Sequence, residues 1–207
     1  MPSVTRRPAG GRDRRDAIAG RVRDAVERLL VAGESFTALP VGRIADEAGI
    51  GRSTFYGHFP DKVALLIALT ESATATLFDR AARWVDEDGT RDELDAVVLH
   101  HVTEYRAHAP LLRAVVEVAG YEPDVDGFWQ ERIVEFAASI RRRIERDQAA
   151  GAAHRSIDAG PAAEWIAWGT ERAVSMHVAT RPPAEDAAFA RGVAGATWAA
   201  MGRLPES

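Results

Sequence analysis

Six polar side chains that can bind DNA are concentrated in residues 52–62. Arg, Ser and Thr occupy three successive positions, and Tyr, His and Lys follow within the same stretch. Guanidinium and hydroxyl groups hydrogen-bond the edges of bases, whereas a Tyr hydroxyl, a His ring or a Lys amine can reach phosphates. Phe55 and Phe59 lie four residues apart and would share the buried face of one short helix. We interpret this helix as a DNA-recognition helix; an ordinary helical hairpin with a solvated polar face is the alternative.

A pair of short helices is predicted for residues 41–62, which read VGRIADEAGIGRSTFYGHFPDK. The first covers about residues 41–48 and is followed by Gly49, at a place where a helix C-terminus favours a residue that tolerates positive φ. The second covers about residues 52–58 and is stopped by Pro60. Helices this short cannot bury a core alone, so other elements must support them.

The same stretch resembles the helix-turn-helix signature of the TetR family of one-component repressors. The pattern I-A-x-x-A-G-I, S-T-F-Y-x-H-F and x-x-K is carried by Ile44, Ala45, Ala48, Gly49, Ile50, Ser53, Thr54, Phe55, Tyr56, His58, Phe59 and Lys62. The signature is specific because its positions stand at fixed spacing. The predicted DNA-binding residues are Thr37, Gly51, Arg52, Ser53, Thr54, Tyr56, His58 and Lys62.

Three positions depart from that family's pattern. Pro40 and Gly51 stand where a hydroxyl usually caps a helix, and Gly42 replaces a polar side chain that often contacts DNA. Thr37 is expected to replace part of the first cap. The second helix must therefore carry most of the sequence specificity. A ligand-binding protein with weakened DNA binding is the alternative that these departures favour.

The fold class predicted for the whole chain is all-α, because no strand-like alternation or internal repeat occurs. About nine helices are expected, three in an N-terminal helix-turn-helix domain and six in a C-terminal helical domain, which is the TetR architecture. Besides the helix pair, they cover about residues 13–32, 61–86, 91–108, 110–120, 124–151, 159–180 and 183–203. The expected divisions are a disordered basic arm at 1–12, a DNA-binding domain at 13–60, and a ligand-binding and dimerisation domain at 61–207.

Two of the long helices have distinct expected roles. The helix at 61–86 runs directly out of the DNA-binding unit, so a movement of its far end would move the recognition helices. The helix at 124–151 carries an apolar stripe at three- and four-residue spacing. Arg141, Arg142 and Arg143 fall on the opposite, polar face, which predicts that they are solvated.

The charge distribution favours a protein that touches DNA at one end. The net charge of the 207 residues is −5. Residues 1–62 contain 11 Lys and Arg against 8 Asp and Glu, so the remaining residues carry 15 against 23. A basic front and an acidic body are typical of DNA binding through the front alone. The arginines of the N-terminal arm form either a solubilising tail or an arm that orders against phosphates or a minor groove.

Four tryptophans lie on C-terminal helices that are expected to pack together. Clustered aromatic residues beside small ones can enclose an apolar cavity, although plain core packing explains any single Trp. Trp129, Phe136, Gly151, Glu171 with Arg172, and Trp198 resemble the ethionamide-resistance-repressor subgroup, whose members have a long, mostly apolar tunnel. The resemblance implies a small apolar or aromatic effector and the lining residues Leu94, Val98, His101, Tyr105, Trp129, Ile133, Phe136, Trp168, Glu171 and Trp198.

Glu171 has two interpretations, a paired structural carboxylate or the polar anchor of the pocket. His101 and Tyr105 are more polar than a purely apolar tunnel would need. The last two helices carry small residues at close spacing, which lets helices approach closely. The resemblance implies a homodimer through these two helices, and hence a palindromic double-stranded DNA operator.

Other classes of function find little support. The chain has no Cys, HExxH, GxSxG or glycine-rich phosphate loop, so we expect neither an enzyme nor a cofactor. His101 and His108 share a helix face with Glu104 between them, but a metal site there is the weaker interpretation. No apolar run suits a membrane span or a signal peptide, and we expect a cytoplasmic protein.

Overall fold

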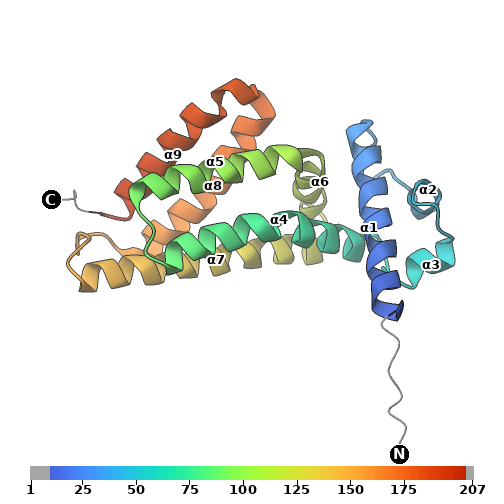
Figure 1. The fold of residues 1–207 in the computed structure, drawn as a ribbon, viewed down its shortest axis with the longest axis horizontal. Coiled ribbons are helices and arrows are strands. Elements are labelled where there is room, and N and C mark those ends of the chain that lie inside the picture. Colours follow the sequence, from blue (N-terminus) through green and yellow to red (C-terminus); the bar gives the residue numbers. More distant parts are fainter. Residues whose placement is uncertain (1–9, 204–207) are drawn as a thin grey trace, which may run out of the picture.

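The computed structural model describes residues 10–203, and the side chains of residues 15–203. Over these residues the chain forms nine α-helices, one short 3-10 helix and no strand, which confirms the all-α prediction (Figure 1). The helices are α1 (Gly10–Val31), α2 (Val41–Glu47), α3 (Arg52–Tyr56), α4 (Lys62–Asp86), α5 (Arg91–Ala107), α6 (Ala109–Ala119), α7 (Pro123–Ala149), α8 (Ala159–Thr180), η1 (Pro183–Glu185) and α9 (Asp186–Ala200).

The helices α1 to α3 form a head at one end of an elongated body of α4 to α9 (Figure 1). The head is built on α1, whose Val22, Ala25 and Val26 are fully buried at the repeat expected of an amphipathic helix. Ile44 of α2 and Phe55 of α3 are also fully buried against it. The two short helices are thus held by α1, as their length requires.

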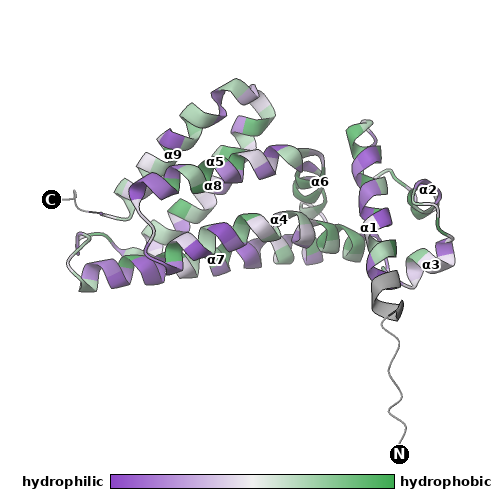
Figure 2. Ribbon diagram, viewed as in Figure 1, coloured by the Kyte–Doolittle hydropathy of each residue, from purple (hydrophilic) through white to green (hydrophobic). Residues whose placement is uncertain are grey.

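The core of the head continues into the body. Leu65 and Leu66 at the start of α4, and Leu111 and Val115 of α6, belong to the same cluster of buried residues as Phe55. Figure 2 shows apolar residues gathered on α4 and α6 where these helices meet α1. Because close-packed residues transmit displacement, a shift of α4 or α6 is transmitted to the head.

Several boundaries differ from those that the sequence predicted. The first helix begins at Gly10, so residues 10–12 of the expected arm are helical, while residues 1–9 lie outside the described part. Helix α3 ends at Tyr56 rather than His58: the Gly57 N–H still bonds the Ser53 carbonyl four residues back, but the His58 N–H bonds the Phe55 carbonyl only three residues back, in a tighter turn. The last helix follows the 3-10 turn and begins at Asp186.

The far end of α4 is fixed by arginines of α7. Arg143 is fully buried, so the prediction that it is solvated was wrong. Its guanidinium donates to the carbonyl oxygens of Trp84, Val85 and Gly89 at 3.2–3.3 Å and pairs with Asp147 at 3.1 Å. A cation at a helix C-terminus satisfies carbonyls that have no partner within the helix.

None of the described helices is both long and apolar enough to cross a bilayer.

Candidate DNA-binding surface and ligand cavity

The turn between α2 and α3 has the geometry that the sequence indicated. Gly49 has a φ of 64°, a value that a residue with a Cβ rarely adopts. Pro40 and Gly51 are the N-cap residues of α2 and α3, and neither supplies a side-chain cap. Both helices therefore depend on packing rather than capping.

The polar residues of α3 present a free surface. Arg52, Ser53 and Tyr56 are exposed, Thr54 and His58 are half-buried, and Phe55 points into the core. No side-chain hydrogen bond to the rest of residues 15–203 occupies Arg52, Ser53, Thr54 or Tyr56. Their donors and acceptors are available to an external partner such as a base edge or a phosphate.

Gly42 accommodates the Arg52 side chain. A Cβ placed on Gly42 would lie 2.3 Å from an Arg52 guanidinium nitrogen, a distance that atoms do not tolerate. The missing side chain, which the sequence suggested would weaken DNA binding, therefore makes room for the arginine of the next helix. Arg52 lies across the start of α2, between the two helices of the motif.

Lys62 is engaged within the protein. Its Nζ donates to the carbonyl oxygens of Phe36 at 2.7 Å and Thr37 at 3.0 Å, and lies 5.0 Å from the centre of the Phe36 ring. Partial burial lowers the pKa of Lys62. The side chain joins the start of α4 to the loop between α1 and α2, which leaves it less free to contact DNA than the sequence suggested.

The variant Lys62→Ala distinguishes a structural role of Lys62 from a contact with a DNA phosphate. We expect a loss of stability of about 1.5–3 kcal/mol, because two hydrogen bonds from a charged donor disappear. The salt dependence of DNA binding should stay the same, since each phosphate contact removed would lower the slope of log K against log salt by about 0.9. Thermal unfolding and binding at several salt concentrations measure both quantities. A slope reduced by one contact at unchanged stability would instead assign Lys62 to a phosphate.

Thr37 links the head to α6 rather than capping α2. Its hydroxyl donates to Glu117 Oε1 at 2.9 Å and lies 2.9 Å from the Tyr121 hydroxyl. The expectation that Thr37 caps α2 was therefore wrong. These contacts place a polar connection between the loop of the head and the end of α6.

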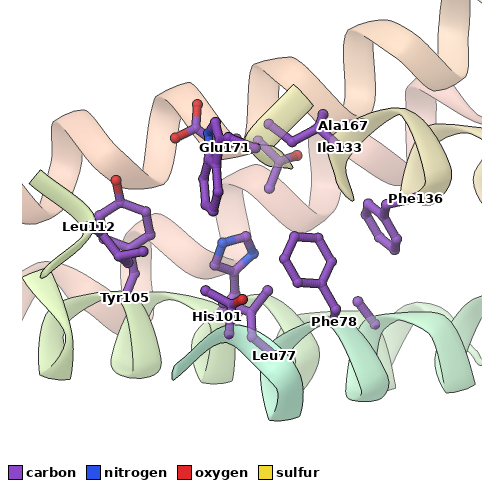
Figure 3. A pocket seen from close by; sticks show the side chains of 13 residues that line it. Leu77, Phe78, His101, Tyr105, Leu112, Ile133, Phe136, Ala167 and Glu171 are labelled. Atoms are coloured by element: carbon purple, nitrogen blue, oxygen red, sulfur yellow. The ribbon is translucent and has the colours of Figure 1, made fainter. Parts of the chain in front are cut away.

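A largely apolar cavity lies inside the body between α4, α5, α6, α7 and α8 (Figure 3). It has a volume of about 40 Å³ and is lined by Thr74, Leu77, Phe78, Ala81, His101, Tyr105, Leu112, Trp129, Ile133, Phe136, Ala167, Thr170 and Glu171. Figure 3 shows the His101 ring pointing into this space, with Glu171 of α8 on the opposite side. The space suffices for a few water molecules, since one needs roughly 10–15 Å³ by this measure.

A second apolar cavity of about 40 Å³ continues from the first toward the far end of α4. It is lined by Ala81, Trp84, Val85, Leu94, Val97, Val98, His101, Phe136, Ile140, Ile166, Thr170, Thr197 and Met201. Four residues line both cavities and stand between them: Ala81, His101, Phe136 and Thr170. Together the two spaces follow α4 for much of its length.

The ionisable side chains in the first cavity are held toward their neutral forms. Burial, with a smaller effect of His100, lowers the pKa of His101 to about 4. Burial also raises the pKa of Glu171 and that of Tyr105. His101 is therefore a neutral imidazole at pH 7, able to donate one hydrogen bond and accept another.

The cavities contain eight of the ten residues that the sequence proposed as lining, and Trp168 and Trp198 are the two exceptions. Trp168 is 39 % exposed on the outer side of α8. Trp198 packs against Trp84 with ring centres 6.3 Å apart, beneath the guanidinium of Arg203. The sequence analysis missed the contribution of α4, although its buried stripe contains Leu77 and Ala81.

His101 and His108, which the sequence offered as a weak metal site, have different surroundings. His101 lines the cavity, whereas His108 Nδ1 lies 3.8 Å from Glu27 of α1. Over the described residues, no three His, Asp or Glu side chains are grouped as metal ligands would be.

The outer faces of α8 and α9 combine exposed apolar and small residues. Trp165 is 61 % exposed and Met176 is 45 % exposed, and both lie on the same helix as Trp168. On α9, Gly192, Ala196 and Ala199 are exposed. Exposed apolar patches on soluble proteins commonly mark interaction sites.

A helix-turn-helix head joined to a helical body with an internal cavity is the organisation of a transcriptional regulator with a separate sensing part. Two protein-family sequence models match this chain. The one described as "Bacterial regulatory proteins, tetR family" matches residues 28–69, and the one described as "Transcriptional regulator EthR, C-terminal domain" matches residues 94–198. The chain belongs to the TetR family of transcriptional regulators.

Individual relatives agree with this assignment. The chain is 27 % identical over 187 residues to the HTH-type transcriptional regulator EthR of Mycolicibacterium smegmatis, which covers 87 % of this chain and 85 % of that protein. A Rhodococcus sp. protein described as a TetR-family regulator is 25 % identical, with a TM-score of 0.64 over 91 % of this chain and 98 % of that one. The SmeT–triclosan complex is 17 % identical and superposes with a TM-score of 0.71, covering 92 % and 98 % of the two chains.

Proposed function

We propose that the protein is a ligand-responsive repressor that binds a palindromic operator as a homodimer and leaves it when a small, mostly apolar molecule fills the cavity. The observation that carries this proposal is the position of the cavity beside α4, the helix that continues from the DNA-binding head. Such a regulator acts on chromosomal DNA, so we place it in the cytoplasm.

The proposed reading surface is the exposed face of α3. Arg52, Ser53 and Thr54 stand at its N-terminal end, which is the part of a recognition helix that contacts base edges in the major groove. Tyr56 and His58 would contact phosphates. A Cβ on Gly51 would meet nothing nearer than 3.8 Å within the protein, so the fold itself does not require glycine there. The missing side chain would instead allow the backbone to approach DNA closely. Thr37 and Lys62 would mainly hold the head in shape.

The proposed dimer pairs α8 and α9 with the same helices of a second copy. Trp165, Trp168 and Met176 would then be buried, which removes apolar surface from water. A two-fold dimer presents two recognition helices to half-sites separated by one or more helical turns, ~34–36 Å each.

The proposed transmission of the signal runs along α4. Its far end is fixed to α7 by Arg143 and by Arg146, which donates to Val85 O at 2.9 Å. Its middle lines the cavities through Thr74, Leu77 and Phe78. An occupant of ordinary size needs about 300–1,000 Å³, so it must displace the walls of the present cavities. With one end fixed, displacement of the middle would turn the other end and the head with it, a shift between two populated states.

A path for ligand entry is suggested by the groove between α4 and α7. Phe78 and Phe136 line both this open groove and the first cavity, and their ring centres lie 6.1 Å apart. The Arg132 guanidinium covers Phe78 from outside, 4.6 Å from the ring centre. We propose that rotation of these rings admits the ligand. The SmeT complex holds triclosan, so a protein with this fold can bind an apolar aromatic molecule.

A selection from random duplex DNA tests the operator and the dimer together. The purified protein should enrich a palindrome with half-sites about one or two turns apart. Arg52→Ala should relax the preference at one base pair per half-site, because a specific pairing of an arginine with a base contributes about 1–3 kcal/mol of discrimination. If no sequence is enriched, or the DNA-free protein sediments as a monomer and binds single half-sites, the proposal of a dimeric operator-binding repressor is wrong.

A further inference from the structure

Glu171 is the only carboxylic acid among the residues that line the first cavity. The other titratable groups there are a neutral His101 and the phenol of Tyr105. Over the described residues, Glu171 has neither a hydrogen-bond partner nor an ion pair. The one charged group that affects its pKa is the exposed Arg172, the next residue in α8. Glu171 is half-buried, and a carboxylate partly removed from water without a counter-charge is unfavourable, so its presence needs an explanation.

No residue that lines the first cavity is a cation; Arg113 of α6 and Arg172 of α8 are near enough to act on Tyr105, but both are exposed and neither lines the cavity. Helix α4 contributes Thr74, Leu77, Phe78 and Ala81, and α6 contributes Leu112. Helix α7 contributes Trp129, Ile133 and Phe136, and α8 adds Ala167 and Thr170 to Glu171. The carboxylate oxygens are not sealed off, because over the described residues only Arg132 Nε is both buried and unpartnered. Because Glu171 also lines the first cavity, its carboxylate is within reach of a ligand bound there.

Four aromatic rings complete the site: Phe78, Tyr105, Trp129 and Phe136. The faces of aromatic rings attract cations, and the attraction grows when water is excluded. Neutral His101 can accept a hydrogen bond from an N–H group at its unprotonated nitrogen. An unpaired carboxylate among aromatic rings and a neutral acceptor is complementary to an ammonium group on an apolar molecule.

We propose that the effector is an apolar molecule that carries a protonated amine, with Glu171 as its counter-charge and the aromatic rings around its hydrocarbon part. This inference rests on the proposed function, because it names the ligand class of the same cavity. It resolves the two interpretations of Glu171 in favour of the ligand anchor. It also sets this chain apart from a tunnel for neutral or anionic lipids, in which a carboxylate would be unfavourable.

Three probes with one skeleton test the charge requirement: 4-phenylbutylamine, 4-phenylbutanol and 4-phenylbutyrate. Calorimetric titration of the full chain should give the amine about tenfold or more tighter binding than the alcohol, with the acid weakest. Glu171→Gln keeps the size of the side chain and removes its charge. It should reduce amine binding to the level of the alcohol and leave alcohol binding unchanged. Glu164→Gln, at an exposed position of the same helix, is the matched control and should change neither.

The outcomes separate this inference from the proposed function. Equal binding of amine and alcohol by the wild type, preferential binding of the acid, or amine binding that survives Glu171→Gln would overturn the amine proposal. Binding of none of the three probes, with the fold intact by thermal unfolding, would also overturn it. The DNA selection is done without ligand, so its success or failure decides operator binding independently.

Discussion

Arg143→Ala should lower the free energy of unfolding by about 3–5 kcal/mol, the cost of breaking a buried ion pair by removing one partner. The fully buried guanidinium satisfies three carbonyls at and after the end of α4 and pairs with two carboxylates, Asp147 at 3.1 Å and the exposed Asp88 at 3.4 Å. Its removal leaves these acceptors without that partner, although Asp147 keeps its contact with Arg203 at 2.6 Å. Chemical unfolding followed by circular dichroism measures the effect.

Arg141→Ala is the control for this change. Arg141 lies on the same helix, pairs with Glu145 at 2.8 Å and is exposed. Exposed pairs of this kind contribute about 0.3–0.5 kcal/mol, so the two variants should differ several-fold in their effect. Equal destabilisation by the two variants would show that Arg143 does not anchor α4.

Phe55→Ala should destabilise the head by about 3–5 kcal/mol, the usual cost of removing a buried Phe side chain. Phe55 is fully buried, and its ring lies 5.6 Å from that of Phe59. It is the one fully buried side chain of α3, so the position of the whole helix depends on it. Operator binding should fall with the folded fraction of the head, while the helices of the body keep most of the circular dichroism signal.

Tyr56→Phe separates unfolding of the head from removal of a single phosphate contact. Tyr56 is 54 % exposed and packs edge-to-face on Phe55, so removal of its hydroxyl leaves the packing intact. We expect unchanged stability and a modest loss of affinity that is the same for all DNA sequences. If Phe55→Ala binds the operator as tightly as the wild type, α3 is not the reading helix.

The sequence predicted the helix-turn-helix unit well because its signals are local. Glycine at a positive-φ turn, two Phe on one face and a proline stop specify two short helices over adjacent residues. The cavity and its lining were predicted from the resemblance to the ethionamide-resistance-repressor subgroup. Eight of the ten proposed lining residues line one or both cavities.

The remaining features depend on contacts between distant segments. The expectation that Arg143 lies on the polar face of α7 was wrong, because this position stands three residues after Ile140 and seven after Phe136, on the buried stripe. The carbonyls of Trp84 and Gly89 that it bonds belong to a distant segment, which the pattern of α7 does not record. Lys62 matches the helix-turn-helix signature and Thr37 was also predicted to bind DNA, but both bond within the protein. Lys62 donates to the loop after α1, and Thr37 in that loop donates to Glu117 of α6. Trp168 was proposed to line the cavity but lies on the outer surface of α8. An apolar residue on an outer surface has the same sequence pattern as one in a core.

The central claim is that occupancy of the cavity controls DNA binding, and thermodynamic linkage tests it most directly. Operator affinity is measured with and without saturating 4-phenylbutylamine, and amine affinity is measured with and without operator. We expect the amine to weaken operator binding by about 5–150-fold and the operator to weaken amine binding by the same factor. Binding of the amine that is lost in Glu171→Gln, with operator affinity of the wild type unchanged at saturating amine, would contradict it.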